Sequence, residues 1–543
     1  MGIKMGGVGS FALSEILPDL KNRSHETDRD QLHDHALQYD ARPNLLNWVA
    51  CIIAGLGPWL YGYDSGIISS IVSPEYTQFY SYFHPSTALT GTVVSIIYAG
   101  AILGGFGMGL ADRWGRQKTI VYYSVISIIG CVLQAAAVNI GMMIAGRLLA
   151  GFAMGALTSL ATLYQAEISP SHVRGMMTAS TKFVNNWGFF AANWIGYGCQ
   201  PLRTSAQWRI PLAVQIVPPV ILLVGMMFLP ESPRWLLAMG RTEQARSVLG
   251  KFRSKDPRHA AVIEAELHDM QVQLDWEHEN LTSRWIDLVN TAPNRRRTSI
   301  AVMVQGMAVF NGIVVMRVLN YYAPTIYTSL GFSGQKVLLI NGLWGLCGPI
   351  ASFIYMIYGA EHFGRRRPLI VCSVIMALLL VWQVACAAQF VNPNYHNLNT
   401  GAAGIVAMMF FGFTFNSSFG PIAWLYQIEI FPMNIRAKGA GVATAATWLA
   451  TLILLQIAPI AFKTIGWKFF IAFIVFNLSN AILCYFFIPE TAGKTLEEIG
   501  VLFGDKNVQI AGTLEGADDE KKIGDSEADE LKTRDQQIVR ETQ

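Results

Sequence analysis

Twelve long apolar stretches follow one another along this chain, and each is long enough to cross a membrane as a helix. A helix needs roughly 20 apolar residues to span the hydrocarbon core of a bilayer. The longest gap between stretches, 230–297, is highly charged and separates six from six. The sequence therefore predicts an all-helical membrane protein with approximate spans at 46–72, 88–110, 119–138, 141–168, 176–199, 210–229, 299–330, 337–359, 368–390, 401–430, 440–462 and 467–488.

The scarcity of charged residues supports this interpretation. Of 543 residues, 52% are hydrophobic and 14% are charged, whereas soluble globular domains carry about 25% charged residues. The net charge of +3 is too small to indicate a nucleic-acid partner. The seven cysteines are scattered singly, almost all in apolar stretches, which is typical of core packing rather than of disulfides or a metal site. We expect no metal and no cofactor.

Basic residues are distributed unevenly between the loops. With both termini in the cytoplasm, the inner loops hold 20 Lys and Arg residues and the outer loops hold five. Because basic residues concentrate in cytoplasmic loops, we predict that both termini are cytoplasmic. The predicted domains are a cytoplasmic tail, a six-helix bundle, a cytoplasmic linker, a second six-helix bundle and a mostly disordered cytoplasmic tail, at 1–45, 46–229, 230–297, 298–488 and 489–543.

Three short motifs occur once in each set of six spans, which indicates an internal repeat. They follow spans 2, 4 and 6 of each set, at offsets of 249, 262 and 259 residues. A duplicated six-span unit is the plan expected of a major facilitator transporter, with the substrate near the midplane between the halves. The motif pairs are DRWGRQK with EHFGRRR (112–118, 361–367), EISPSHVR with EIFPMNIR (167–174, 429–436) and PESPR with PETAG (230–234, 489–493).

The charges of these motifs collect at the cytoplasmic ends of the spans. Acidic residues end spans and basic residues begin spans on the same side, so we expect ion pairs between these ends to hold an inner gate closed. Sliding the halves apart would break such pairs, which makes them a two-state element. The alternative is that these charges only fix the topology. The predicted gate residues are Arg113, Arg116, Glu167, Arg174, Glu231, Arg365, Arg366, Glu429, Arg436 and Glu490.

Further motifs complete an ordered set of eight: GYD at 62–64, GR at 146–147, YYAP at 321–324 and GPIAW at 420–424 join the repeated-motif segments at 112–118, 167–175, 230–234 and 489–496. In this order they resemble the sugar porter family of the major facilitator superfamily, especially its fungal proton-coupled members, over 45–500. The resemblance implies alternating access and a central sugar site formed largely by spans 5, 7, 8, 10 and 11. It also implies short cytoplasmic helices within 230–297.

Two opposite charges lie inside spans of the first half at similar depth. Asp64 is about eight residues from the outer end of span 1, and Arg147 is about six residues into span 4, roughly 12 Å and 9 Å deep. A charge within a membrane is costly and is therefore a functional candidate. In the proton-coupled members that the chain resembles, the Asp of GYD is the proton site and the Arg of GR is its partner. We predict proton coupling through this pair; the alternative is a structural ion pair that never titrates.

Two cations replace neutral residues at positions that the resemblance assigns to sugar binding. Lys182 stands where sugar porters usually have a Gln, and Arg317 stands where they have an Asn when span 7 is aligned on Tyr321. We prefer this alignment to one based on Gln305 and Asn311. The two cations favour an anionic substrate, because a carboxylate suits an ammonium and a guanidinium. The predicted substrate-binding residues are Lys182, Asn186, Asn311, Arg317, Tyr321, Asn416, Trp424, Thr447 and Trp448.

Both cations also have alternative interpretations. Lys182 is about 11 Å from the inner interface and can reach it by snorkelling. Arg317 can form a salt bridge between helices.

The sequence thus predicts a proton-coupled secondary active transporter, a symporter that moves a monosaccharide or sugar-like solute, and an acidic sugar such as a uronate is one candidate. Alternatives are a neutral hexose or pentose transporter, a transporter-like nutrient receptor and a small-metabolite exporter. An enzyme is not expected, because no nucleophile, metal cluster or phosphate loop is apparent. We expect a multi-pass protein of the plasma membrane that functions as a monomer, with a small sugar or sugar acid, protons and the lipid bilayer as partners.

Overall fold

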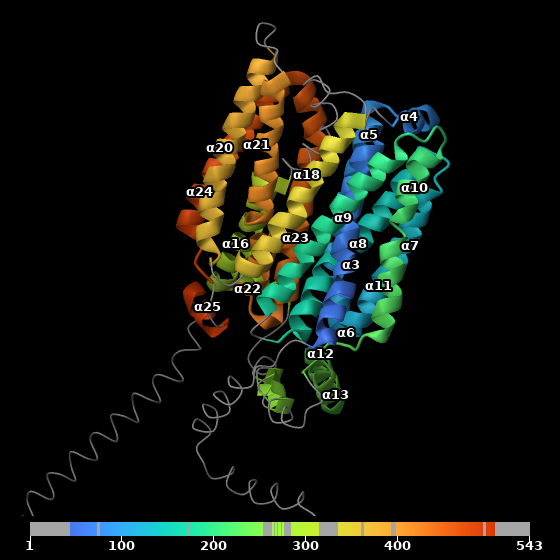
Figure 1. Ribbon diagram of the computed structural model, residues 1–543. Coiled ribbons are helices and arrows are strands. Elements are labelled where there is room, and N and C mark those ends of the chain that lie inside the picture. The colour runs from blue at the N-terminus through green and yellow to red at the C-terminus, as the bar shows by residue number, and fades with distance from the viewer. Residues whose placement is uncertain are drawn as a thin grey trace, which may run out of the picture.

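The computed structural model describes residues 44–504, apart from 73–75, 171–173, 254–262, 265, 269, 273, 276–283, 314–334, 360–362, 392–397 and 492–495. Every regular element in that part of the chain is a helix, and the long helices stand side by side in two groups (Figure 1). Ten segments are long and apolar enough to cross a membrane. The other two predicted spans are α9 (Arg174–Cys199), which is long but carries polar side chains, and 299–330, of which 299–313 is described. The all-helical membrane fold is confirmed.

The first group of helices, called here the N-terminal bundle, runs from α3 to α11. Its second span continues through η1 and α6 as far as Trp114, four residues beyond the predicted end. The elements are α3 (Leu45–Ile71), α4 (Thr77–Phe83), α5 (Thr87–Phe106), η1 (Gly107–Gly109), α6 (Leu110–Trp114), α7 (Arg116–Ala135), α8 (Ile140–Ile168), α9, α10 (Ala206–Val214) and α11 (Val217–Phe228).

The second group, called here the C-terminal bundle, runs from α16 to α24. Its eleventh span, α23, has 33 residues and extends beyond the predicted apolar stretch at both ends. The elements are α16 (Ala292–Ala308), the π-helix η4 (Val309–Ile313), α18 (Gln335–Ile354), the π-helix η5 (Tyr355–Gly359), α20 (Arg366–Val391), α21 (Leu398–Asn416), α22 (Phe419–Glu429), α23 (Met433–Ile465), η7 (Gly466–Lys468) and α24 (Phe469–Phe487).

Small residues bring α3 and α9 into close contact within the N-terminal bundle. A Cβ atom on Gly62 would collide with the backbone oxygen of Asn185, and one on Gly188 would collide with that of Trp59. Glycines allow two backbones to approach closely in this way. The contact fixes the rotation of α9, and therefore decides which of its polar side chains face the other bundle.

The predicted tenth span is broken into two helices. Ser417 and Ser418 separate α21 from α22, and Pro421 lies in the first turn of α22. Proline has no N–H to donate, so an uninterrupted helix through this position would lose a backbone hydrogen bond. The break leaves Asn416 at the end of one helix and Gly420 at the start of the next.

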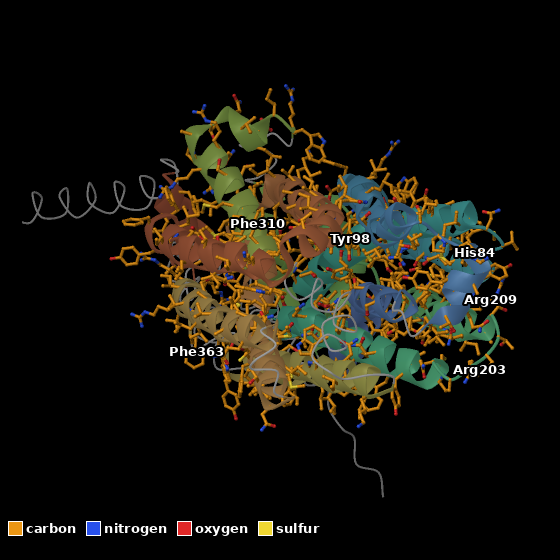
Figure 2. All side chains as sticks on the ribbon, turned by 90° about the horizontal axis from the view of Figure 1, so that it is seen from above. His84, Tyr98, Arg203, Arg209, Phe310 and Phe363 are labelled. Carbon is orange, nitrogen blue, oxygen red and sulfur yellow. The ribbon has the colours of Figure 1, made fainter. Side chains whose placement is uncertain are left out.

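The two bundles meet along two pairs of helices. α5 packs against α23, and α9 packs against α18. Gln456 donates a hydrogen bond to Ser95 across the first contact, and Asn341 donates to Asn193 across the second, at 3.3 Å. Seen from above, Tyr98 lies near the middle of the molecule, where the bundles adjoin, and Arg209 lies at the outer edge of the N-terminal bundle (Figure 2).

Two short helices, α12 (Pro233–Ala238) and α13 (Thr242–Arg253), lie below the bundles at one end of the molecule (Figure 1). A third, α15 (Asp287–Asn290), packs against α16 and α23. Arg253 donates a hydrogen bond of 3.1 Å to the Ile168 carbonyl, which ties α13 to the end of α8. A further helix, α25 (Leu496–Phe503), occupies part of the segment predicted to be mostly disordered, and the Phe503 ring lies 5.1 Å from the Arg297 guanidinium. The tails at 1–43 and 505–543 lie outside the described residues.

Candidate functional site

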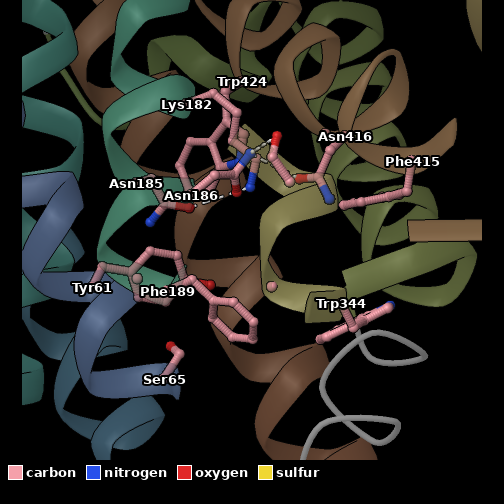
Figure 3. Close-up of a pocket in the computed structure, with 14 residues that line it drawn as sticks. Tyr61, Ser65, Lys182, Asn185, Asn186, Phe189, Trp344, Phe415, Asn416 and Trp424 are labelled. Atoms are coloured by element: carbon pink, nitrogen blue, oxygen red, sulfur yellow. Dashed lines mark hydrogen bonds between the residues drawn. The ribbon is translucent and has the colours of Figure 1, made fainter. Parts of the chain in front are cut away.

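A cavity lies between the two bundles, with about 90 Å³ available to the centres of water-sized molecules. A single water needs roughly 10–15 Å³ on this measure, so the cavity has room for a small solute. Its described walls come from α3, α9, α18 and the two halves of the tenth span (Figure 3). The lining residues are Tyr61, Gly62, Ser65, Lys182, Asn185, Asn186, Phe189, Trp344, Gly345, Gly348, Phe415, Asn416, Gly420 and Trp424.

Lys182, Asn186 and Asn193 recur at helical spacing on α9 and form one polar stripe. The Lys182 ammonium donates a hydrogen bond of 3.3 Å to the Asn185 Oδ1 atom. Asn185 in turn donates from Nδ2 to the Pro58 carbonyl of α3, at 2.8 Å. The ammonium is therefore directed into the cavity by a side chain that is itself anchored on the neighbouring helix.

Asn186 bridges the two bundles across the cavity. Its Nδ2 atom donates to the Gly348 carbonyl at 3.1 Å, to Ser352 Oγ at 3.2 Å and to Asn416 Oδ1 at 3.1 Å. Asn416 can accept this bond because it ends α21 at the break in the tenth span. Three acceptors thus compete for two N–H groups, so a polar solute can replace one of them without leaving the amide unpaired.

The structure brings together four of the predicted substrate-binding residues: Lys182, Asn186, Asn416 and Trp424. Trp448 does not line the cavity but packs behind Trp424, and the centroids of the two rings are 6.0 Å apart. The cavity also includes aromatic residues that the sequence reasoning missed. For Phe189, a usable signal was its position seven residues after Lys182, two turns along the same helix.

Two other predicted residues do not line this cavity. Thr447 donates a hydrogen bond of 2.9 Å to Gln305 Oε1, inside the C-terminal bundle. Asn311 donates to Ser373 of α20, also at 2.9 Å. Gln305, the anchor of the alternative alignment, donates to Gln427 at 2.7 Å and belongs to the same buried network as Thr447. The predicted residues Arg317 and Tyr321 lie outside the described part of the chain.

The predicted intramembrane ion pair is formed. Arg147 Nη2 lies 3.3 Å from Asp64 Oδ2, and the two side chains are 0% and 5% exposed. Arg147 Nη1 also donates to Gln134 Oε1 at 3.5 Å, a partner that the sequence reasoning missed. Arg147 Nε has no hydrogen-bond partner among the described residues. A buried carboxylate that loses its proton here has a guanidinium ready to stabilise the charge.

The motif charges gather at one end of the bundles, called here the charged end, which carries the ion pairs of Arg116 and Arg365. In the N-terminal bundle, Arg116 binds Glu167 with Nη2 to Oε1 at 2.9 Å. The Glu231 carboxylate accepts hydrogen bonds from the backbone N–H groups of Arg116 and Gln117, at 2.8 and 3.0 Å. Glu231 thereby caps the start of α7, where a negative charge is favourable.

The C-terminal bundle repeats this arrangement. Arg365 binds Glu429 at 2.9 Å, and Glu490 accepts from the backbone N–H groups of Arg365 and Arg366 at 2.7 and 2.9 Å. Burial disfavours the charged form of Arg365, but Glu429, with Tyr355 and Glu490, more than offsets this, and the pKa of the guanidinium is raised above its ordinary value. The equivalent glycines, Gly115 and Gly364, both have positive φ and lie directly under the capping carboxylate.

Both ion pairs therefore join elements within one bundle, so moving the bundles apart as rigid bodies would leave them intact. This differs from the expected arrangement, in which separation breaks the pairs. A longer-range electrostatic interaction does cross between the bundles, since the charge of Lys438 on α23 favours the ionised form of Asp112 on α6. The Lys438 ammonium also lies 5.9 Å from the Trp285 ring. The sequence reasoning counted Lys438 only as a topogenic charge.

The remaining predicted gate residues occupy the same end. Arg113 is exposed. Arg436 donates from Nε to the Phe431 carbonyl at 3.1 Å, and Arg366 donates to the Tyr485 carbonyl. Arg174 begins α9, but its side chain lies outside the described part of the structure.

Two repeated helical bundles with a polar cavity between them define a secondary transporter of the major facilitator type. The chain belongs to the family described as "Sugar (and other) transporter", whose profile matches residues 50–503. It is therefore a membrane transporter rather than an enzyme.

Curated relatives cover most of the chain. MFS-type transporter criB of Aspergillus cristatus is 34% identical over 468 residues, covering 86% of this chain and 95% of the relative. MFS glucose transporter mfs1 of Aspergillus flavus is 29% identical, covering 83% and 89%. Quinate permease of Neurospora africana is also 29% identical, covering 86% and 91%.

A solved structure supports the fold. The proton:xylose symporter XylE of E. coli, bound to 6-bromo-6-deoxy-D-glucose, has a TM-score of 0.72 and 24% identity, covering 84% of this chain and 99% of that chain.

Proposed function

We propose that this protein is a proton-coupled symporter of a sugar-like carboxylic acid, such as a uronate or another polyhydroxylated acid. The observation that carries the proposal is the Lys182 ammonium in the central cavity. No Asp or Glu is among the described lining residues. A substrate carboxylate would supply the missing counter-charge through a charge-assisted hydrogen bond.

The relatives support both the acidic substrate and its neutral alternative. Quinate permease is named for a carboxylic acid, whereas mfs1 is named for glucose. The asparagines of the cavity can bond one or two hydroxyl groups of either kind of solute. Lys182 is the feature that favours the acid.

Proton coupling rests on the buried pair of Asp64 and Arg147. Protonation of Asp64 would remove the charge that holds Arg147 and allow the N-terminal bundle to rearrange, which links the proton to a change of conformation. One proton carried with one monocarboxylate moves no net charge. One proton carried with a neutral sugar moves one positive charge.

This difference in charge provides the test. The purified protein is reconstituted in vesicles, and uptake of labelled glucuronate is driven by a pH gradient with the membrane potential either clamped at zero or imposed with potassium and valinomycin. We expect glucuronate accumulation to follow the pH gradient and to be unaffected by the potential. Glucose uptake that exceeds glucuronate uptake and rises with an inside-negative potential would show that the neutral sugar is the substrate.

A substitution at Lys182 tests whether this residue determines the preference for an acid over a neutral sugar. A charge-assisted hydrogen bond contributes about 1.5–3 kcal/mol, so Lys182→Gln should lower the preference for glucuronate over glucose roughly ten- to a hundredfold. Lys468→Gln, an exposed cation at the end opposite the charged end, is the matched control and should leave the preference unchanged.

The charged end serves as the gate on the cytoplasmic side, and both termini lie in the cytoplasm. The protein functions as a monomer in the plasma membrane. The excess of basic residues in the loops at the charged end supports the cytoplasmic placement of that end and of the termini.

A further inference from the structure

The central cavity has two unlike ends. Lys182 and Trp424 lie at one end, and Phe189, Ser65 and Trp344 lie towards the other, with the asparagines between them (Figure 3). Lys182 and Phe189 are seven residues apart on α9, which corresponds to about 10 Å along the helix. A solute that fills the cavity therefore meets a cation at one end and aromatic rings at the other.

Most of the amide N–H groups in the described walls are already bonded within the protein. Asn185 donates to the Pro58 carbonyl at 2.8 Å, and Asn416 donates from Nδ2 to the Gly412 carbonyl at 2.9 Å. Asn186 donates to acceptors on the opposite bundle. A solute with a hydroxyl on every ring carbon would leave several of them unpaired in these walls, which is unfavourable for a buried polar group.

Aromatic side chains supply much of the remaining wall. The Phe189 and Trp344 rings meet edge to face, with centroids 5.8 Å apart and an interplanar angle of 72°. They come from opposite bundles, so both must be in place for the cavity to close. Ring faces and edges of this kind bind flat or apolar rings well. The aromatic lining residues are Tyr61, Phe189, Trp344, Phe415 and Trp424.

We infer that the preferred substrate is a monocarboxylate whose ring carries few hydroxyl groups, that is, an aromatic or cyclohexane-type acid. The carboxylate binds Lys182, the ring lies against Phe189 and Trp344, and one or two hydroxyl groups reach Asn186. This inference rests on the proposed transport of an acid, keeps the carboxylate at Lys182, and replaces the polyhydroxylated acids by ring acids with few hydroxyl groups at the same cavity.

The test compares ligands on the purified full-length protein by thermal unfolding, because at a given concentration a ligand stabilises the folded state more the more tightly it binds. The probes are 4-hydroxybenzoate, cyclohexanecarboxylate, glucuronate, glucose and 4-hydroxybenzamide, which is the uncharged analogue of the first. We expect both ring acids to stabilise the protein at concentrations about tenfold lower than glucuronate. The benzamide should be at least as weak as glucuronate.

Variants separate the two ends of the cavity. Trp344→Leu and Phe189→Leu should each remove the advantage of the ring acids over glucuronate, whereas Lys182→Gln should remove the advantage of 4-hydroxybenzoate over 4-hydroxybenzamide. Trp187→Leu is the control, since Trp187 is on the same helix but is 41% exposed and does not line the cavity.

The outcomes distinguish this inference from the proposed function. Tighter binding of glucuronate than of either ring acid overturns the inference and leaves acid transport standing. Tighter binding of glucose than of every acid, or no stabilisation by any acid, overturns both. Ring acids that bind best but are unaffected by both aromatic variants bind elsewhere, which also overturns the inference.

Discussion

The interiors of the two bundles are held together by different chemistry, although their charged ends are built alike. Inside the N-terminal bundle, Arg147 and Asp64 form an ion pair at 3.3 Å. Inside the C-terminal bundle, Gln305 connects α16 to α22 through Gln427 at 2.7 Å and to α23 through Thr447 at 2.9 Å. Amide and hydroxyl side chains do not gain or lose a proton in the ordinary pH range, whereas a carboxylate can.

This difference indicates that the two bundles have different roles in transport. A neutral network that is fully hydrogen-bonded holds its helices in a fixed relation, because breaking it would leave buried polar groups unpaired. An ion pair with a carboxylate can exist in two states, because the carboxyl group is either ionised and paired or protonated and neutral. We therefore expect the N-terminal bundle to change conformation when Asp64 gains or loses a proton. The C-terminal bundle should keep its helices in a fixed relation.

The largest expected effect comes from Asp64→Asn, which removes the proton-carrying group. With one proton per substrate, a gradient of one pH unit supports about tenfold accumulation. The variant should accumulate nothing above the external concentration while still exchanging labelled for unlabelled substrate in vesicles. Gln427→Leu is the control in the other bundle and should keep its accumulation. Undiminished concentrative uptake by Asp64→Asn would make the pair structural.

The next effect tests how far the charged ends are alike. Glu167→Gln and Glu429→Gln each remove one partner of an ion pair, but the Glu167 side chain is 8% exposed and that of Glu429 is 22% exposed. Because removing one partner of a more buried ion pair leaves the other charge buried without compensation, we expect a roughly threefold to tenfold lower turnover for Glu167→Gln and a smaller loss for Glu429→Gln.

Although each pair lies within one bundle, its loss should loosen the helix ends that meet at the charged end, so the accessibility of single cysteines there should rise in both variants. Glu243→Gln is the control, since its side chain is 81% exposed and pairs with Arg246 at the surface. If cysteine labelling matches that of the unaltered protein in both gate variants, the charges only set the topology.

A smaller effect, on stability rather than on transport, tests the neutral network. Gln427→Leu removes the acceptor of the Gln305 Nε2 bond and should lower the free energy of unfolding by about 1–3 kcal/mol. The lower end of this range is expected, because Gln305 Nε2 also donates to the Ala423 carbonyl at 3.2 Å. Thermal unfolding in detergent measures the change. A variant that unfolds like the original but loses proton coupling would assign the coupling to the C-terminal bundle instead.

The smallest expected effect concerns the electrostatic interaction between Lys438 and Asp112, which crosses between the bundles. Lys438→Gln removes the cation that acts on Asp112, and a partly exposed charge of this kind contributes about 1 kcal/mol or less. We expect at most a fivefold change in the balance between the two open states, read from cysteine accessibility at both ends. A larger shift than that of Glu167→Gln would mean that Lys438 is the main gate residue.

The membrane fold and the intramembrane ion pair could both be predicted from the sequence. The apolar stretches and the duplicated motifs are local patterns, and the residues that explain each of them lie close together in the sequence. Asp64 and Arg147 were identifiable because a charge inside an apolar span is costly and must find a partner at its own depth. That partner was found at 3.3 Å.

The tertiary structure alone decided which polar residues share the cavity. Asn186 and Asn416 are 230 positions apart and meet at 3.1 Å, whereas Gln305 and Thr447 form a separate network within one bundle. It also decided that Arg116 and Arg365 pair within their own bundles. The physical reason is that cavity membership depends on how each helix is rotated. That rotation is set by contacts such as those at Gly62 and Gly188, and not by the hydropathy of any single span.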